Sequence, residues 1–380
     1  MRIIFVINNV DFLLSHRIDI CIAAVQGGYE VHVISPSNEQ VASVLKGMGI
    51  FFHELELSRS GKNPFLELKS AFNLFRIFQK IKPDLVHLIT IKPYLYGGIV
   101  ARLAKVPAVV SAVAGLGILF SSSEPKYRLI RLSIYPLFKL AFGHKNQVVI
   151  FQNSTDQHIL VNWKVLHMHK ARIIRGSGVK LSSYPALPEP ENHPLIVSFA
   201  SRLLKDKGVE ILANASRLLK YKKIDVVIWL IGEVDSGNKN SITQQQLRDW
   251  EDEGLVEVLG FRSDIADLFG KSNIIALPSF YGEGLPKVLI EAAACGRATI
   301  TTDHPGCRDA IEDGVTGLLV PVRNAEAIAN AVLILLGDQQ RCKEMGRAGR
   351  KRAEEMFDVK QVVAEHMEVY EGLAGSGLQV

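Results

Sequence analysis

The stretch 274–296 limits the possible fold most, because it reads as a strand, a glycine loop and a helix in immediate succession. The apolar run 274–278 is typical of a short buried strand. Pro286 follows a loop with two glycines and stands where the first helical residue is expected, since its missing N–H costs nothing there. Apolar residues then recur at helical spacing until Gly296, which favours a helix stop. The stretch therefore predicts a strand end, an open loop and a helix N-terminus in one place.

Two carboxylates lie on this unit, Glu283 on the loop and Glu291 inside the helix. Free N–H groups at a helix start can hold an anion, and glycines let a ligand approach the backbone. A carboxylate is a poor partner for phosphate but a good acceptor for sugar hydroxyls. A ligand with both groups, such as a nucleotide sugar, fits this pattern. The alternative is that Glu291 pairs with Lys287 at i, i+4 and that Glu283 is solvated.

Apolar strand patterns alternate with helical patterns along the whole chain, which predicts an α/β fold of parallel sheets. We expect an N-terminal Rossmann-like, acceptor-binding domain over 1–185 and a nucleotide-sugar-binding Rossmann-like domain over 190–357, facing each other across a cleft. The Pro-rich stretch 187–194 reads as the linker. A last helix within 358–380 is expected to pack back on the first domain. The loop 8–17 lacks the glycine-rich dinucleotide fingerprint, which argues against an NAD enzyme.

Composition agrees with a globular protein of 380 residues, with 48% hydrophobic and 22% charged residues. Its four cysteines are scattered without paired spacing, which favours reduced thiols over a zinc site or a disulfide framework. The N-terminal apolar run is too short for a signal peptide, and no run of about 20 apolar residues predicts a spanning helix. We therefore expect a cytoplasmic protein.

Candidate ligand-binding residues in the first half follow the expected strands, where ligands bind in open α/β sheets. They are Asn9 and His16 after the first strand, Lys92 after the strand at 85–89, and Gly115 and Gly117 after the strand at 108–113. Lys92 is a candidate for a phosphate, and the glycines allow close backbone approach. The alternatives are a helix-start role for His16 and an ordinary exposed lysine at position 92.

The second half carries two cations, Arg202 and Lys207, in the loop after the strand at 195–200. A fixed guanidinium fork and a point charge suit a diphosphate. Gly232, which closes the next strand, is a candidate contact for the same donor. Phe261 ends the expected strand at 257–261 and Arg262 follows it, and this turn is a candidate for the nucleotide base. The alternative reading of Arg202 and Lys207 is two surface cations.

The stretch 125–155 contains no acidic residue, and Arg128, Arg131 and Lys139 fall on one helical stripe. A basic amphipathic helix of this kind can lie on an anionic membrane surface. We expect Ile130, Ile134, Leu137 and Ala141 to form the opposite, inward face. The alternative is a core helix with a solvated basic face. Nucleic acid is a poorer partner, because no aromatic platform or known motif accompanies the charges.

The spacing of Glu283 and Glu291 in the stretch Gly-Glu-Gly-Leu-Pro…Glu-Ala-Ala-Ala-Cys-Gly resembles the signature of family 4 retaining glycosyltransferases with the GT-B fold. Segments 201–208, 176–179 and 314–318 also resemble recurring segments of that family. The resemblance extends over essentially the whole chain. Segments 92–98 and 114–117 resemble bacterial enzymes that extend undecaprenyl-diphosphate-linked sugars of O-antigen, capsule or protein glycans. Two departures are Ala114, where many members carry a His, and Lys180, where the subgroup carries an Asp.

This resemblance implies that Arg202 and Lys207 neutralise the donor diphosphate and that Glu291 accepts the ribose hydroxyls. Glu283, with the backbone of Gly284, Leu285 and Pro286, would hold the donor sugar.

The implied activity is metal-independent transfer of an N-acetylhexosamine or a deoxy relative from a UDP-sugar, with retention, at the inner face of the cell membrane. The acceptor is expected to be a lipid-diphosphate-linked saccharide. The alternatives are a GT-B-fold sugar-nucleotide epimerase or phosphorylase, and a non-catalytic subunit.

Overall fold

The computed structural model describes residues 1–56, 64–122, 124–191 and 194–376. The chain forms two compact units, one of residues 1–177 with the chain from Lys360 onward, the other Gly178–Val359. The expected boundary at 185–190 therefore falls inside the second unit, and so does the described part of the Pro-rich stretch 187–194. The chain passes between units before this stretch because η3 (Leu181–Ser183) and Tyr184 already contact the second core.

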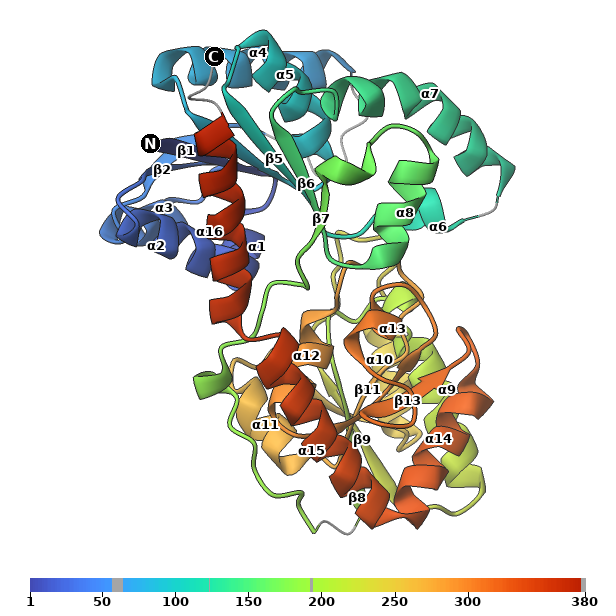
Figure 1. Ribbon diagram of the computed structural model, residues 1–380. Helices are drawn as coiled ribbons and strands as arrows, with labels where there is room; N and C mark the ends of the chain where they lie inside the picture. Colours follow the sequence, from blue (N-terminus) through green and yellow to red (C-terminus); the bar gives the residue numbers. More distant parts are fainter. Residues whose placement is uncertain (57–63, 123, 192–193, 377–380) are drawn as a thin grey trace. The chain divides into compact units, whose positions relative to one another are not determined.

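The first unit is built on a seven-stranded sheet in the order β3-β2-β1-β4-β5-β6-β7 (Figure 1). All its strand pairs are parallel. The central strands are buried along almost their whole length because helices cover both faces of the sheet. The strands are β1 (Arg2–Ile7), β2 (Glu30–Ser35), β3 (Phe51–Glu54), β4 (Leu85–Ile89), β5 (Ala108–Val113), β6 (Gln147–Phe151) and β7 (Ala171–Ile173).

Helices cover the two faces of this sheet with separate apolar cores. One core joins the sheet to α2 (Ile18–Gln26), α3 (Glu39–Gly47) and α16 (Val359–Ser376). The other joins it to α4 (Pro64–Ile81), α5 (Gly98–Leu103), α7 (Pro125–Ala141) and α8 (Ser154–Asn162). The remaining helical segments of this unit are α1 (Val10–His16), a π-helical turn η1 (Pro93–Gly97), α6 (Ile118–Ser121) and η2 (Met168–Lys170).

The second unit repeats the arrangement with a six-stranded parallel sheet in the order β10-β9-β8-β11-β12-β13. In both sheets the order reverses beside the first strand, as in doubly wound nucleotide-binding folds. The reversal lies between β1 and β4 in one sheet and between β8 and β11 in the other. The strands are β8 (Leu195–Ala200), β9 (Val226–Ile231), β10 (Glu257–Gly260), β11 (Ile274–Leu277), β12 (Ala298–Thr302) and β13 (Gly317–Val320).

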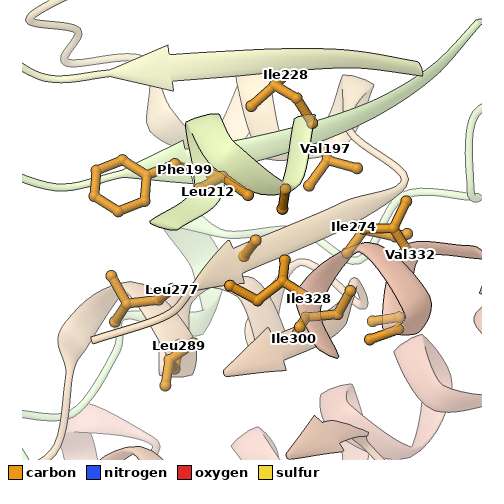
Figure 2. Packing of buried hydrophobic residues seen from close by; sticks show 14 of the residues in the cluster. Val197, Phe199, Leu212, Ile228, Ile274, Leu277, Leu289, Ile300, Ile328 and Val332 are labelled. Carbon is orange, nitrogen blue, oxygen red and sulfur yellow. The ribbon is translucent and has the colours of Figure 1, made fainter. Parts of the chain in front are cut away.

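Close packing of aliphatic side chains joins this second sheet to its helices. Figure 2 shows Val197 and Ile228 from neighbouring strands, with Ile328 and Val332 from a covering helix near Ile274. The longer helices are α9 (Val209–Tyr221), α10 (Gln244–Asp252), α12 (Lys287–Ala294), α14 (Ala325–Gly337) and α15 (Gln339–Met356), and the shorter ones are η4 (Lys205–Lys207), α11 (Ile265–Lys271) and α13 (Cys307–Ala310).

Most strands predicted from apolar runs are confirmed, but the expected loop at 8–17 is wrong. It contains α1, whose N-cap Asn9 accepts a hydrogen bond from the Asp11 N–H at 3.1 Å. The prediction at Pro286 is also off by one residue. Pro286 caps α12 with extended backbone, and the helix begins at Lys287. Gly296 has a φ of 69° just after that helix, as the predicted stop requires.

The predicted basic stripe of α7 is wrong at Arg131. Its guanidinium is partly buried and donates to the carbonyl oxygens of Leu119 and Ser122 at 2.7 and 3.0 Å. Of the predicted inward face, Ala141 is buried and Ile134 packs against the core, but Ile130 and Leu137 are exposed, and the buried Phe138 was not predicted.

A polar cluster lies buried in the first unit where α16 covers β4. The Tyr370 hydroxyl and His87 Nδ1 are 2.6 Å apart, and His366 Nδ1 lies 2.7 Å from the Val362 carbonyl oxygen. Arg17 is also buried and donates to the Gly176 carbonyl oxygen. Burial, with Arg17 close by, lowers the pKa of His366 to about 3 and holds the pKa of His87 well below its ordinary value.

We predict that acid destabilises the protein through these two histidines. Their folded pKa values lie below the unfolded value near 6.5, so the unfolded chain binds more protons below that pH. Above about pH 6.5 both histidines are neutral in the folded and the unfolded chain, so the free energy of unfolding is not reduced. Below that pH, each histidine lowers the free energy of unfolding by about 1.4 kcal/mol per pH unit. Urea unfolding followed by circular dichroism from pH 7.5 to 5 measures this slope.

The matched variants are His366→Leu and His158→Leu, because His158 is an exposed residue of α8. His366→Leu should reduce the dependence of stability on pH, and His158→Leu should leave it unchanged. An unaltered slope in His366→Leu would contradict the assignment.

Candidate active site

The predicted cations and the glutamate loop of the second unit meet at the carboxyl ends of β8 and β11, where the strand order reverses. The loop 201–208 leaves β8 and the loop 278–286 leaves β11. Ligands of open α/β sheets bind at such a reversal, because the flanking loops diverge there. Parallel strand topology therefore brings Arg202, Lys207 and Glu283 to one edge of the sheet.

Main-chain contacts press these two loops together. A Cβ atom on Gly208 would meet the Pro278 carbonyl oxygen at 2.1 Å, so only glycine fits there. The Phe280 N–H donates to the Asp206 carbonyl oxygen at 2.9 Å, and the Ser279 hydroxyl reaches the same oxygen at 3.3 Å. These main-chain contacts therefore set the distance between the two functional loops independently of any ion pair between them.

Lys207 and Glu283 form a mostly buried ion pair across this junction. Lys207 Nζ lies 2.5 Å from Glu283 Oε2, and the two side chains are 15% and 12% exposed. The Ser279 hydroxyl donates to Glu283 Oε1 at 2.6 Å. The alternative of a solvated Glu283 is therefore wrong. The pair holds an ammonium group and a carboxylate side by side, which suits a ligand with both phosphate and hydroxyl groups.

Arg202 stands at the same edge in a more open place. Its Nη1 lies 3.1 Å from Asp235 Oδ2, and the two side chains are 56% and 33% exposed. Asp235 belongs to the loop after β9 and was not among the predicted site residues. Gly232, a predicted donor contact, has a φ of 147°, and a Cβ there would meet the Ser201 carbonyl oxygen at 2.0 Å. A glycine is therefore required at position 232 for the ends of β8 and β9 to pack together.

Glu291 is buried on α12, and its two contacts both use Oε1. The Tyr184 hydroxyl donates to it at 2.7 Å, and Lys287 Nζ lies 3.5 Å away. The alternative i, i+4 pair is therefore present. Burial raises the pKa of Glu291, although Lys287 and Tyr184 act in the opposite direction. Tyr184 was missed from the sequence because it lies 107 residues from its partner.

The rest of the predicted donor loop is fixed by the end of β12. Gly306 has a φ of 83°, and a Cβ there would meet the Gly284 carbonyl oxygen at 2.2 Å. Leu285 is buried and Pro286 caps α12. His304, from the same β12 loop, lies near Glu283, and burial lowers its pKa. This histidine was another residue missed from the sequence, although its position in the loop after β12 could have signalled it.

Phe261 and Arg262 lie after the edge strand β10, away from the junction of β8 and β11 in the strand order. The Phe261 ring is largely exposed, and Arg262 Nε donates to Asp264 Oδ1 at 2.7 Å. The Gly232 N–H donates to the Gly260 carbonyl oxygen at 2.8 Å, which links this turn to the end of β9.

The predicted residues of the first unit all lie after strands of its sheet. His16 ends α1, where its ring stacks on Phe12 with centroids 4.1 Å apart and Nδ1 lies 2.7 Å from the Ser15 hydroxyl. Lys92 Nζ is 2.5 Å from Glu67 Oε1, and both side chains are mostly buried. The alternative of an ordinary exposed lysine is therefore wrong. Gly115 and Gly117 both have positive φ.

A strained contact marks the strand reversal of the first unit. Thr90 has a φ of 75°, which a β-branched residue rarely adopts, and its hydroxyl donates to Asn8 Oδ1 at 2.9 Å. Such strain persists where surrounding structure enforces it, and it gathers at functional sites. Neither residue was predicted, although both directly follow strands.

The described residues contain no helix long and apolar enough to span a membrane, and no group of three or more His, Cys, Asp or Glu side chains arranged to hold a metal ion.

Fold and site together define a two-domain α/β protein whose second unit places paired cations and carboxylates at its strand reversal. Models of two glycosyltransferase families match it, "Glycosyl transferases group 1" over residues 185–352 and "Glycosyl transferase 4-like" over residues 2–153. The chain belongs to these glycosyltransferases, as its sequence motifs predicted.

Two curated relatives match most of the chain. The N,N'-diacetylbacillosaminyl-diphospho-undecaprenol alpha-1,3-N-acetylgalactosaminyltransferase of Campylobacter jejuni is 28% identical, and the match covers 98% of each chain. The capsular polysaccharide biosynthesis glycosyltransferase CapM of Staphylococcus aureus is 26% identical, over 80% of each chain.

Solved structures share the fold. Anabaena HepE in complex with UDP and glucose has a TM-score of 0.78 at 20% identity, covering 98% of this chain and 99% of that one. A glycosyltransferase from Rickettsia africae also has a TM-score of 0.78, at 22% identity and 98% coverage of both chains. The predicted GT-B fold with two Rossmann-like domains is confirmed.

We predict that the Lys207–Glu283 pair stabilises the second unit. Lys207→Met should lower the free energy of unfolding by about 3 kcal/mol, because a buried carboxylate loses its cation. Lys205→Met is the matched control, since Lys205 is nearly half exposed and lies 3.7 Å from Glu210; it should cost less than about 1 kcal/mol. Urea unfolding measures both.

The double variant Lys207→Met with Glu283→Gln should recover part of that loss, because no uncompensated charge is then buried. Equal costs for Lys207→Met and Lys205→Met would contradict the buried pair.

Proposed function

We propose that this glycosyltransferase moves an N-acetylhexosamine or a deoxy relative from a UDP-sugar to a lipid-diphosphate-linked saccharide in bacterial surface glycan assembly. The main support is the meeting of Arg202, Lys207 and Glu283 at the strand reversal of the second unit. The Campylobacter jejuni relative is named as acting on an undecaprenol-diphosphate-linked sugar, which favours the same kind of acceptor here.

In this proposal the second unit binds the donor. Arg202 and Lys207 face the diphosphate and stabilise the charge that grows as UDP leaves, an effect of preorganised cations that accounts for much of enzymatic rate enhancement. The N–H groups at the start of α12 add partial positive charge. Glu283 and the backbone of 284–286 hold the sugar. Glu291 Oε1 is engaged by Tyr184 and Lys287, so the second oxygen, Oε2, would accept a ribose hydroxyl.

The reaction proposed retains the configuration of the anomeric carbon and needs no metal. The bond from the anomeric carbon to the diphosphate oxygen breaks, the acceptor hydroxyl oxygen bonds to that carbon, and its proton is released. Charge stabilisation by Arg202 and Lys207 takes the place of a divalent ion. In the first unit, Asn9, His16, Lys92, Gly115 and Gly117 are proposed to line the acceptor or phosphate subsite.

Turnover with a panel of UDP-, GDP- and dTDP-sugars and a polyprenyl-diphosphate-linked N-acetylhexosamine tests this function by mass spectrometry. We expect a product one sugar heavier with one UDP-sugar, an α-linkage by NMR if the donor is α-linked, and full activity in EDTA. Product formed from the donor without acceptor would favour an epimerase. Donor binding with no product from any sugar would favour the non-catalytic subunit.

Arg202→Ala should lower turnover about a hundredfold or more, because one charge-stabilising group contributes about 3 to 4 kcal/mol to the barrier. Lys207→Ala is expected to do the same at a temperature where the variant is folded. Arg217→Ala is the matched control, since Arg217 makes a similarly exposed pair with Glu253 in the same unit. A loss below about threefold in Arg202→Ala would contradict its role.

We further propose that the enzyme works on an anionic membrane surface at the inner face of the cell membrane, and that α4 and α7 of the first unit make the contact. Both helices pack against α5 and η1. They expose large apolar side chains, with Phe65 80% and Leu129 70% exposed, and Leu68, Phe72 and Leu132 also outside the core.

Basic residues accompany this apolar surface. Arg128 and Lys139 are exposed on α7, whereas Arg131 is drawn inward and is not expected to reach lipid. Apolar contact and roughly 1 kcal/mol per basic residue would act together at an anionic bilayer. Of the three basic residues predicted for this stripe, Arg128 and Lys139 are therefore the two expected to act at the bilayer.

We predict that Leu129→Glu with Leu132→Glu lowers binding to vesicles containing phosphatidylglycerol at least tenfold, because two apolar side chains are removed from the surface. Arg128→Glu with Lys139→Glu should weaken binding mainly at low salt. Val44→Glu on α3 is the control, since Val44 is exposed on a different helix. Co-sedimentation that does not change in either double variant would contradict the proposed face.

A further inference from the structure

Arg202, which the proposed function places against the donor diphosphate, already has a carboxylate partner within its own chain. Its Nη1 lies 3.1 Å from Asp235 Oδ2, and the contact is open to solvent. A diphosphate arriving at Arg202 therefore meets a negative charge at the same guanidinium. The inference below rests on the proposed function, because it concerns how tightly this site holds UDP.

The main chain keeps Asp235 in that place. The Asp235 N–H donates to the Ser241 hydroxyl at 2.9 Å, and that hydroxyl reaches the Leu203 carbonyl oxygen at 3.3 Å. The Lys205 N–H donates to the Asn240 carbonyl oxygen at 2.7 Å, and the Leu203 N–H donates to the Glu233 carbonyl oxygen at 3.0 Å. The loop 233–242 is thus joined to the loop 201–208 by backbone bonds, so Asp235 stays beside Arg202 when a ligand binds.

The two ion pairs of the site differ in a way that suggests different roles. Lys207 and Glu283 are mostly buried, and Glu283 also accepts from Ser279. Arg202 and Asp235 are more exposed, and exposed pairs are weak and readily exchanged. Arg202 has five N–H donors, so it can turn some of them to a phosphate while Asp235 remains close.

We propose that Asp235 is a positioning residue that competes with the donor diphosphate for Arg202. Before binding it holds the guanidinium at the edge of the sheet. With UDP bound, the carboxylate repels the phosphates and limits affinity. When the sugar has been transferred, Asp235 pairs again with Arg202 and helps UDP to leave.

The test compares binding of UDP and uridine to Asp235→Asn, which keeps the shape of the side chain and removes its charge. UDP should bind about three- to tenfold more tightly, the range expected for one exposed charge near another. Most of the change should be in the dissociation rate, as for most affinity changes at a single site. Uridine has no phosphate, so its affinity should not change.

Two further variants separate charge from structure. Asp235→Glu should return UDP affinity close to that of the wild type, because the negative charge is restored. Glu253→Gln, which removes the partner of Arg217 elsewhere in the same unit, should leave UDP affinity unchanged. Equal UDP affinity in Asp235→Asn and wild type would overturn the inference, and so would an equal gain for uridine.

This design also separates the inference from the proposed function. A wild-type protein that binds no UDP would overturn the function and the inference together. A wild-type protein that binds UDP and turns over, with no effect of Asp235→Asn, would overturn the inference alone.

Discussion

The buried pair of Lys207 and Glu283 is the interaction on which the proposed site depends. It joins the loops that leave β8 and β11, and it does so at the one place in the sheet where neighbouring loops diverge. Gly208 makes the junction possible, since any side chain there would strike the Pro278 carbonyl oxygen. The ammonium group and the carboxylate are mostly buried at this junction. Either group without the other would be a buried charge that lacks its partner, at a cost of several kcal/mol.

The site is nearly balanced in charge before any substrate arrives. Arg202 faces Asp235 and Lys207 faces Glu283. Asp206 adds a further carboxylate, whose pKa burial raises although it accepts from Asn240. Binding a diphosphate therefore exchanges internal partners for external ones, and the net affinity is the difference between the two. Under the proposed function UDP must leave after every turnover, and such an exchange of partners favours its release more than unopposed cations would.

The sequence allowed much of the site to be predicted, because its residues follow strand ends or lie on one short helix. Glu283 and Glu291 are close in the chain, and strand topology explains why Lys207 meets Glu283 and why Arg202 lies at the same edge of the sheet. Partners distant in the chain were not predictable. Asp235 and Tyr184 have no local pattern that marks them as partners of Arg202 and Glu291. The orientation of Arg131 was also missed, since helical spacing does not show which neighbouring carbonyl groups attract a side chain.

The sequence by itself determined the alternation of strands and helices, because apolar periodicity and glycine stops act over a few residues. The strands at 85–89, 108–113 and 195–200 have the predicted bounds. The strand β6 was missed, since it lies inside the stretch read as a basic surface helix. Only the tertiary structure decided the strand orders and the division of the chain at Ser177. Those features depend on contacts between residues far apart in the chain, and no local pattern contains that information.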